Sequence, residues 1–189
     1  MGSVENEDNA QRSTANPDGP HRAVPAEHDG TELFVYGTLR HDQPEHARFC
    51  RGVVGWSRAS LRGSLRRLPS GYLVLVVDPG AVLLHATGDA LVDETRRRAL
   101  ADSVRTLDST GTSGWIEGEV LRFRDAAEAW PPLDRWEDFR PGVPGAYQRC
   151  VVPVRVNADV TSADQETRAR MIAAWAYVAS GAPAGSVAV

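Results

Sequence analysis

The chain has 189 residues, of which 42% are hydrophobic and 24% are charged, a composition typical of a soluble domain with a sizeable core. Its net charge of −4, spread along the chain, argues against a nucleic-acid partner, because phosphate binding needs a basic face. No apolar run approaches the roughly 20 residues that span a bilayer, and the N-terminal residues lack the basic and apolar parts of a secretory signal. We therefore expect a cytoplasmic protein with no nucleic-acid or membrane partner.

The basic residues, cysteines and histidines restrict the chemistry further. All 21 residues counted as Lys+Arg are arginine, which excludes a Schiff-base lysine and a lysine-bearing phosphate loop, and the arginine-rich composition indicates a bacterial source. Cys50 and Cys150 lack metal-type spacing and are expected to be buried thiols. His41 and His46 lie close together, but no cysteine or acidic cluster completes a zinc set around them. We expect neither a metal nor an organic cofactor.

The first strongly apolar stretch is Leu33 to Tyr36, which follows a polar leader, residues 1–30, that we expect to be disordered. Four apolar or aromatic residues in succession predict a strand buried on both faces. Gly37, Thr38 and Leu39 then predict a turn, with Gly37 at a positive φ or close to another backbone. The backbone N–H groups of such a turn can hold a carboxylate or a developing oxyanion, although an ordinary turn after a core strand is the simpler interpretation.

The middle of the chain alternates hydrophobic runs with turn signals. We predict a short helix from Pro44 to Cys50, a strand with one solvated face from Leu61 to Leu68, and a buried strand from Tyr72 to Val77. Asp78-Pro79-Gly80 predicts a turn, so Ala81 to Ala86 is interpreted as the returning strand of a hairpin.

A helix is predicted from Asp93 to Leu107, with Asp93 as its N-cap and Arg96-Arg97-Arg98 on a solvated face. Further strands are predicted at 115–121, 147–156 and 171–178, and a helix at 125–136 after an interruption at Pro131-Pro132. Residues 181–189 are expected to form a flexible tail. Several strands in hairpin-like succession favour an α+β fold, a small mixed or antiparallel β-barrel with flanking helices.

Glu137 is the candidate acid/base residue. Leu133 and Trp136 lie three apart on one apolar helical face and Phe139 extends it, so Glu137 beside that face is expected to be partly buried. Burial raises the pKa of a carboxyl group and makes its carboxylate a better base near neutral pH. Taken alone, a glutamate among other acidic residues is more simply explained as surface charge.

Four segments carry a family resemblance: Phe34-Val35-Tyr36-Gly37-Thr38-Leu39, Leu133-Asp134 with Glu137, Tyr147-Gln148-Arg149, and Ala174-Trp175-Ala176-Tyr177-Val178. Together they resemble the gamma-glutamylcyclotransferase-like superfamily, which includes AIG2-like and butirosin-pathway cyclotransferases. The resemblance covers residues 32–180 and implies one domain of this type at 31–180. It also implies site residues: Glu137 as the acid/base, and Tyr36, Gly37, Thr38, Leu39 and Tyr147 in substrate binding.

The resemblance further implies a cofactor-independent amine lyase or acyltransferase that acts on a small-molecule gamma-glutamyl substrate. The substrate's α-amine attacks its own γ-carbonyl, which closes 5-oxoproline and releases an amine, while Glu137 moves the proton. The turn after Tyr36 holds either the oxyanion or the α-carboxylate. Two alternatives remain: removal of a gamma-glutamyl protecting group in natural-product biosynthesis, and a non-catalytic small-molecule-binding module of the same fold.

The sequence departs from the family pattern at three places. Residues 81–114 are longer than the usual short hairpin, so we predict an insertion there, beside the pocket mouth, that tunes which amine leaves. Tyr72-Leu73 stands in place of a common Tyr-Pro, and Asp138 stands where a glycine often follows the glutamate.

Overall fold

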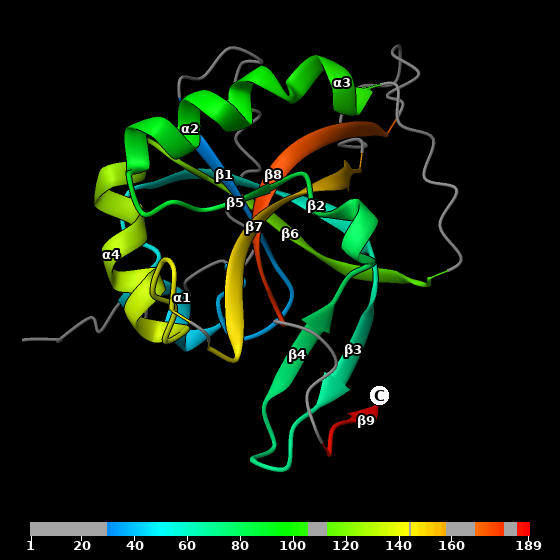
Figure 1. Cartoon of the computed structure of the whole chain (residues 1–189). Coiled ribbons are helices and arrows are strands. Elements are labelled where there is room, and N and C mark those ends of the chain that lie inside the picture. Colours follow the sequence, from blue (N-terminus) through cyan, green and yellow to red (C-terminus); the bar gives the residue numbers. More distant parts are fainter. Residues whose placement is uncertain (1–29, 106–112, 144, 158–168, 180–184) are drawn as a thin grey trace, which may run out of the picture.

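Five strands of the described part of the chain close into a mixed β-barrel (Figure 1). The structure, a computed structural model, describes residues 30–105, 113–143, 145–157, 169–179 and 185–189. Around the barrel the strands are β2 (Val53–Arg62), β6 (Trp115–Phe123), β1 (Thr31–Val35), β8 (Arg170–Ala179) and β7 (Tyr147–Val156), and β7 pairs back with β2. β1 and β8 are parallel, and the other neighbours are antiparallel. The predicted α+β fold, a small mixed barrel with flanking helices, is confirmed.

Helices cover the outside of the barrel. In the described residues these are α1 (Pro44–Phe49), α2 (Ala90–Ala99), α3 (Ala101–Arg105) and α4 (Ala126–Trp136). Successive side chains of a strand point to opposite faces, so Leu33 packs toward the helices with Leu133 of α4, whereas Phe34 packs inside the barrel with Val120. Leu33 and Phe34 are both buried, as the continuous apolar run predicts.

A second, smaller sheet projects from the barrel (Figure 1). It contains β3 (Ser64–Arg67), β4 (Leu73–Val76) and β9 (Val187–Ala188). β9 lies in the range expected to be a flexible tail, yet Ala188 pairs with Arg66 of β3. Backbone pairing rather than burial forms this strand, since Val187 remains 61% exposed.

The predicted hairpin of Tyr72 to Val77 with Ala81 to Ala86 is wrong. The Asp78 carboxylate accepts the Gly80 N–H at 2.8 Å and begins the 3₁₀-helix η1 (Pro79–Ala81), which leads the chain away from β4. The next strand, β5 (Leu84–His85), therefore pairs with β7.

α2 begins earlier than predicted. Its N-cap is Asp89, whose Oδ1 accepts the N–H groups of Leu91 and Val92, both at 3.0 Å. Asp93, the predicted N-cap, lies inside the helix and is fully buried. Both aspartates are plausible caps in sequence, and the tertiary contacts of Asp93 decide between them.

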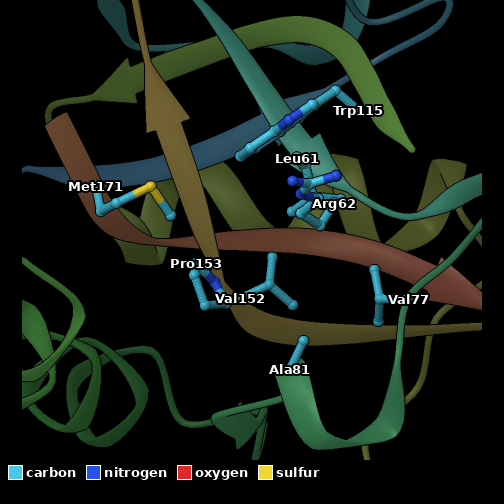
Figure 2. Close-up of a pocket in the computed structure, with 8 residues that line it drawn as sticks. All are labelled: Leu61, Arg62, Val77, Ala81, Trp115, Val152, Pro153 and Met171. Atoms are coloured by element: carbon cyan, nitrogen blue, oxygen red, sulfur yellow. The ribbon is translucent and has the colours of Figure 1, made fainter. Parts of the chain in front are cut away.

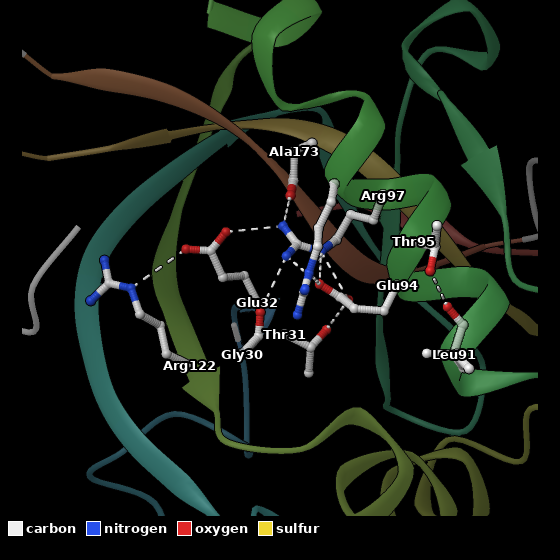
Figure 3. A network of polar contacts seen from close by, with 10 residues as sticks. Gly30, Thr31, Glu32, Leu91, Glu94, Thr95, Arg97, Arg122 and Ala173 are labelled. Carbon is white, nitrogen blue, oxygen red and sulfur yellow. Dashed lines mark hydrogen bonds and ion pairs between the residues drawn. The ribbon is translucent and has the colours of Figure 1, made fainter. Parts of the chain in front are cut away.

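Arg97, expected on a solvated face, is only 6% exposed. Its guanidinium contacts Glu94 in the same helix, Glu32 of β1 at 3.1 Å and the Ala173 carbonyl of β8 at 2.8 Å (Figure 3). Thr31 of β1 donates a further hydrogen bond to Glu94 at 2.7 Å. Carboxylates from two elements compensate the buried cation, and this network binds α2 to the barrel.

The prolines of α4 do not interrupt it. The helix is continuous from Ala126 to Trp136, and its N-cap Asp125 accepts the Ala127 N–H at 2.8 Å. Trp130 and Leu133, which flank Pro131-Pro132, are both buried in the core. Tertiary packing outweighs the low helix propensity of the two prolines, so the predicted interruption is wrong.

Some predictions fall on residues that the structure does not describe. These are residues 1–29 of the leader, 106–112 of the insertion, and 180–184 at the domain end and in the predicted tail, so the limits 31–180 and 81–114 and the flexible tail stay predictions. Among the described residues, no helix combines the length and apolar character needed to cross a membrane.

Candidate active site

Glu137 is the C-cap residue of α4. Its N–H donates to the Leu133 carbonyl at 3.0 Å, and the Phe139 N–H donates to the Asp134 carbonyl at 2.8 Å. Asp138 between them has φ 48°, the left-handed conformation that commonly follows a helix end. This turn fixes the backbone from which the half-buried Glu137 side chain projects.

Burial raises the pKa of Glu137 from 4.5 to about 7. The cause is desolvation, which penalises the charged carboxylate more than the neutral acid. A carboxyl group with such a pKa can accept and release a proton at neutral pH, as an acid/base catalyst must.

Three tyrosines and a cysteine face the Glu137 carboxylate. Burial first, and the charge of Glu137 second, raise the pKa of Tyr36 above its ordinary value and raise the pKa values of Tyr147 and Cys50 to about 12. Burial also raises the pKa of Tyr177 well above its ordinary value, with a smaller contribution from Glu137. All four groups therefore stay protonated at neutral pH, beside a carboxyl group whose pKa of about 7 lets it exist in both forms.

Tyr36 and Tyr147 also connect the site to the projecting sheet. The Leu75 N–H donates to the Tyr36 hydroxyl oxygen at 3.1 Å, and the Tyr147 hydroxyl donates to the Leu73 carbonyl at 3.1 Å. Both partners are backbone groups of β4, so this strand orients the two tyrosines.

The turn after β1 is closed by a hydrogen bond from the Arg40 N–H to the Gly37 carbonyl at 3.1 Å. No described residue accepts a hydrogen bond from the N–H of Gly37, Thr38 or Leu39, and the first two of these residues are exposed. Both expectations for Gly37 are wrong: its φ is not positive, and a Cβ there would meet no heavy atom within 4 Å. As the first residue of the turn, Gly37 needs no unusual φ.

The structure brings part of the predicted site together. Tyr36, Tyr147 and Glu137 form one group, and Leu39 adjoins it because its carbonyl lies 3.7 Å from the Cys50 sulfur. Gly37 and Thr38 lie next to Tyr36 in the exposed turn. Sequence reasoning gave Tyr177 no role, although strand alternation places it on the same face of β8 as the buried Trp175, toward the helices. The roles of all these residues remain predictions.

His41, Asp42 and Glu119 are the one group in the described residues whose ligand atoms, within 4.8 Å of one another, could hold a metal ion. The Glu119 carboxylate, however, accepts the His41 N–H at 2.8 Å and contacts the His41 ring at 2.8 Å, and Arg40 Nε lies 3.5 Å away. An arginine beside an already bonded carboxylate disfavours a cation there. The structural partner of His41 is thus Glu119, which is distant in sequence, and not His46.

A small pocket lies elsewhere on the barrel (Figure 2). It is lined by Leu61, Arg62, Val77, Ala81, Trp115, Val152, Pro153 and Met171. Its lining is apolar apart from Arg62 and includes none of the predicted site residues. We therefore do not assign the reaction to it.

Solved structures similar to the chain include three with low sequence identity. YkqA from Bacillus subtilis is 18% identical with a TM-score of 0.43, over 80% of this chain and 36% of that chain, so this chain spans about a third of YkqA. An AIG2-like protein from Mus musculus is 16% identical with a TM-score of 0.45, over 84% and 82%. A gamma glutamyl cyclotransferase specific to glutathione from yeast is 12% identical with a TM-score of 0.44, over 79% and 69%. A search of curated proteins returned no match.

The family model described as gamma-glutamyl cyclotransferase, AIG2-like, matches residues 33–101 and 84–187. The matched ranges include Tyr36, Tyr147 and Glu137, the residues that the structure gathers in one group. Because the match extends over most of the sequence, the chain belongs to the gamma-glutamyl cyclotransferase, AIG2-like family.

Proposed function

We propose that the protein converts a gamma-glutamyl amine or peptide into 5-oxoproline and a free amine. Family membership and the fold indicate a gamma-glutamyl cyclotransferase-like activity. The observation that supports the finer proposal is the half-buried Glu137, with a pKa of about 7, among the hydroxyl groups of Tyr36 and Tyr147. A carboxyl group of this kind suits a reaction that needs one proton removed and one delivered.

In the proposed step, the α-amine nitrogen of the substrate forms a bond to its own γ-carbonyl carbon, and the bond from that carbon to the leaving amine breaks. Glu137 takes a proton from the α-amine and delivers it to the leaving nitrogen. The reaction is an acyl transfer and needs no oxidant or reductant. The substrate supplies its own nucleophile, so the protein has to hold it curled, and the free N–H groups of residues 37–39 are donors for its α-carboxylate or the oxyanion.

The test is incubation with a panel of gamma-glutamyl amines and peptides and detection of 5-oxoproline. We expect turnover by the wild type and a loss of at least about 100-fold in kcat for Glu137→Gln, which keeps the shape and removes the base. Asp138→Asn is the matched control, because it neutralises the neighbouring carboxylate, whose side chain is 90% exposed, and should keep turnover. Glu137→Gln activity within about tenfold of wild type would exclude the role of Glu137. Binding without turnover by the wild type would support a non-catalytic module.

A further inference from the structure

Three polar side chains, two buried and one half-buried, connect α4 to β7 and β8 beside Glu137. The Tyr177 hydroxyl of β8 donates to Asp134 Oδ1 at 2.6 Å, and Arg149 Nε of β7 lies 3.1 Å from the same oxygen. Tyr177 is 4% exposed and Arg149 is 1% exposed. Asp134 lies in the last turn of α4, three residues before Glu137.

Arg149 extends this connection to α2. Its guanidinium lies 4.2 Å from the Trp130 ring centroid, and one of its nitrogens is 3.7 Å from the Asp93 carboxylate. Asp93 is fully buried and also accepts the Thr87 N–H at 2.8 Å. The buried cation thus has a carboxylate from each of two helices beside it, which offsets part of the cost of burying its charge.

Asp134 is fixed at two points. Its carboxylate contacts Tyr177 and Arg149, and its carbonyl accepts the Phe139 N–H of the turn that follows Glu137. A rotation of the helix end would break contacts at both points. The side chains of Tyr177, Asp134 and Arg149 therefore restrict the backbone that carries Glu137.

We propose that Tyr177, Asp134 and Arg149 are positioning residues that hold the end of α4, and with it the Glu137 carboxylate, in the reactive position. This inference rests on the proposed function for its catalytic consequence, because it assigns Glu137 as the reacting group. None of the three needs to touch the substrate. A misplacement of about 1 Å in a catalytic group can cost about 100-fold in rate, so such support has a measurable effect.

The pKa of Glu137 is a measure of whether these three side chains hold the end of α4 in place. The titratable groups that face Glu137 are Tyr36 of the β1 turn, Cys50 after α1, Tyr147 of β7 and Tyr177 of β8. Their pKa values are all raised, those of Tyr147 and Cys50 to about 12, so none of the four titrates near neutral pH. Desolvation also raises the pKa of the Asp134 carboxyl group. The NMR measurement therefore follows the side-chain Cδ of Glu137, whose own pKa is about 7, and not the Cγ of an aspartate.

The test compares Tyr177→Phe with a matched control, Thr31→Val. Each removes one buried hydroxyl that donates to a carboxylate, at 2.6 Å for Tyr177 and at 2.7 Å for Thr31, and the Thr31 network lies on α2 and β1 (Figure 3). For Tyr177→Phe we expect kcat to fall about 10- to 100-fold with little change in KM. We also expect the Glu137 pKa, measured by carboxyl NMR, to fall by about one unit, because a loosened helix end admits water. Thr31→Val should match wild type in both.

A wild-type kcat and a wild-type Glu137 titration in Tyr177→Phe would overturn the proposal. Equal effects of Tyr177→Phe and Thr31→Val would also overturn it, because the loss would then reflect general stability. If the wild type turns over no gamma-glutamyl substrate, the proposed function fails, and the NMR comparison alone still decides whether Tyr177 positions Glu137.

Discussion

The Glu137 carboxyl group determines how activity should depend on pH. Burial raises its pKa to about 7, so the carboxylate that acts as a base is the minor form below that pH. We expect kcat/KM to rise about tenfold per pH unit on the acidic side and to level off above about pH 7. The measurement is a pH profile on one gamma-glutamyl substrate, with Asp138→Asn as a control. A rising limb centred at the ordinary carboxyl value would contradict the burial of the working base.

The backbone of Asp138 is strained in the sharp turn after Glu137. Its φ of 48° is a conformation that glycine adopts more easily than residues with a β-carbon. We expect Asp138→Gly to raise the free energy of unfolding by about 0.5 kcal/mol, and Asp138→Ala to lower it, in denaturant titrations. Asp138 lies 3.7 Å from Arg140, but both side chains are exposed, so this ion pair contributes little. A glycine variant less stable than wild type would show that the aspartate contributes a contact of its own.

At the scale of elements, the loop before α2 meets the loop after Glu137 at Gly88. Gly88 has φ +93°, and a Cβ there would lie 2.6 Å from Pro141 Cγ. Gly71 is the matched control, because its φ is +90° but a Cβ would meet nothing within 4 Å. We expect Gly71→Ala to cost about 1 to 2 kcal/mol of unfolding free energy from backbone strain, and Gly88→Ala to cost more because a clash is added.

Thermal or denaturant unfolding of the two alanine variants distinguishes strain from contact. Equal losses would mean that the loop relaxes away from Pro141. A larger loss in Gly88→Ala, together with reduced turnover, would indicate that the contact between these loops also affects the Glu137 turn.

The packing of α2 bears on the predicted insertion. Residues 81–114 were expected to lie beside the pocket mouth, and for the segment as a whole this stays a prediction. α2 itself packs mainly against α4, α3 and β8, and its Asp93 reaches the buried Arg149. α2 therefore contacts α4, the helix that ends at Glu137, both directly and through Asp93 and Arg149.

At the scale of the whole molecule, sequence predicted the elements better than their connections. Continuous apolar runs located β1 and β8, because a strand buried on both faces needs them. The hairpin after Asp78 was wrong because the same Asp-Pro-Gly signal also begins a 3₁₀-helix. Burial of Arg97 could not be predicted either, since its compensating carboxylate Glu32 comes from a distant part of the chain.

In the candidate site, too, single residues could be predicted better than their neighbours in space. Glu137 could be proposed from its place beside an apolar helical face and from family resemblance. Tyr36 and Tyr147 could be proposed as site residues from the family resemblance, but Tyr177 could not. That the three surround Glu137 could not be predicted, because Tyr36 follows β1, Tyr147 begins β7 and Tyr177 lies in β8, and no local pattern specifies the order of these strands around the barrel. Gly37 was misjudged because its sequence context does not distinguish the first position of a turn from a later one.

The parallel pair of β1 and β8 has a consequence for biogenesis. Leu33 pairs with Trp175, so the first and the last strand of the barrel are neighbours. A chain still on the ribosome cannot close the barrel until β8 has emerged, and contacts between distant parts of a chain form slowly. Tyr177 belongs to that same last strand. Nascent chains should therefore acquire the complete surroundings of Glu137 only after β8 has emerged, in the step that also covers the exposed edge of β1.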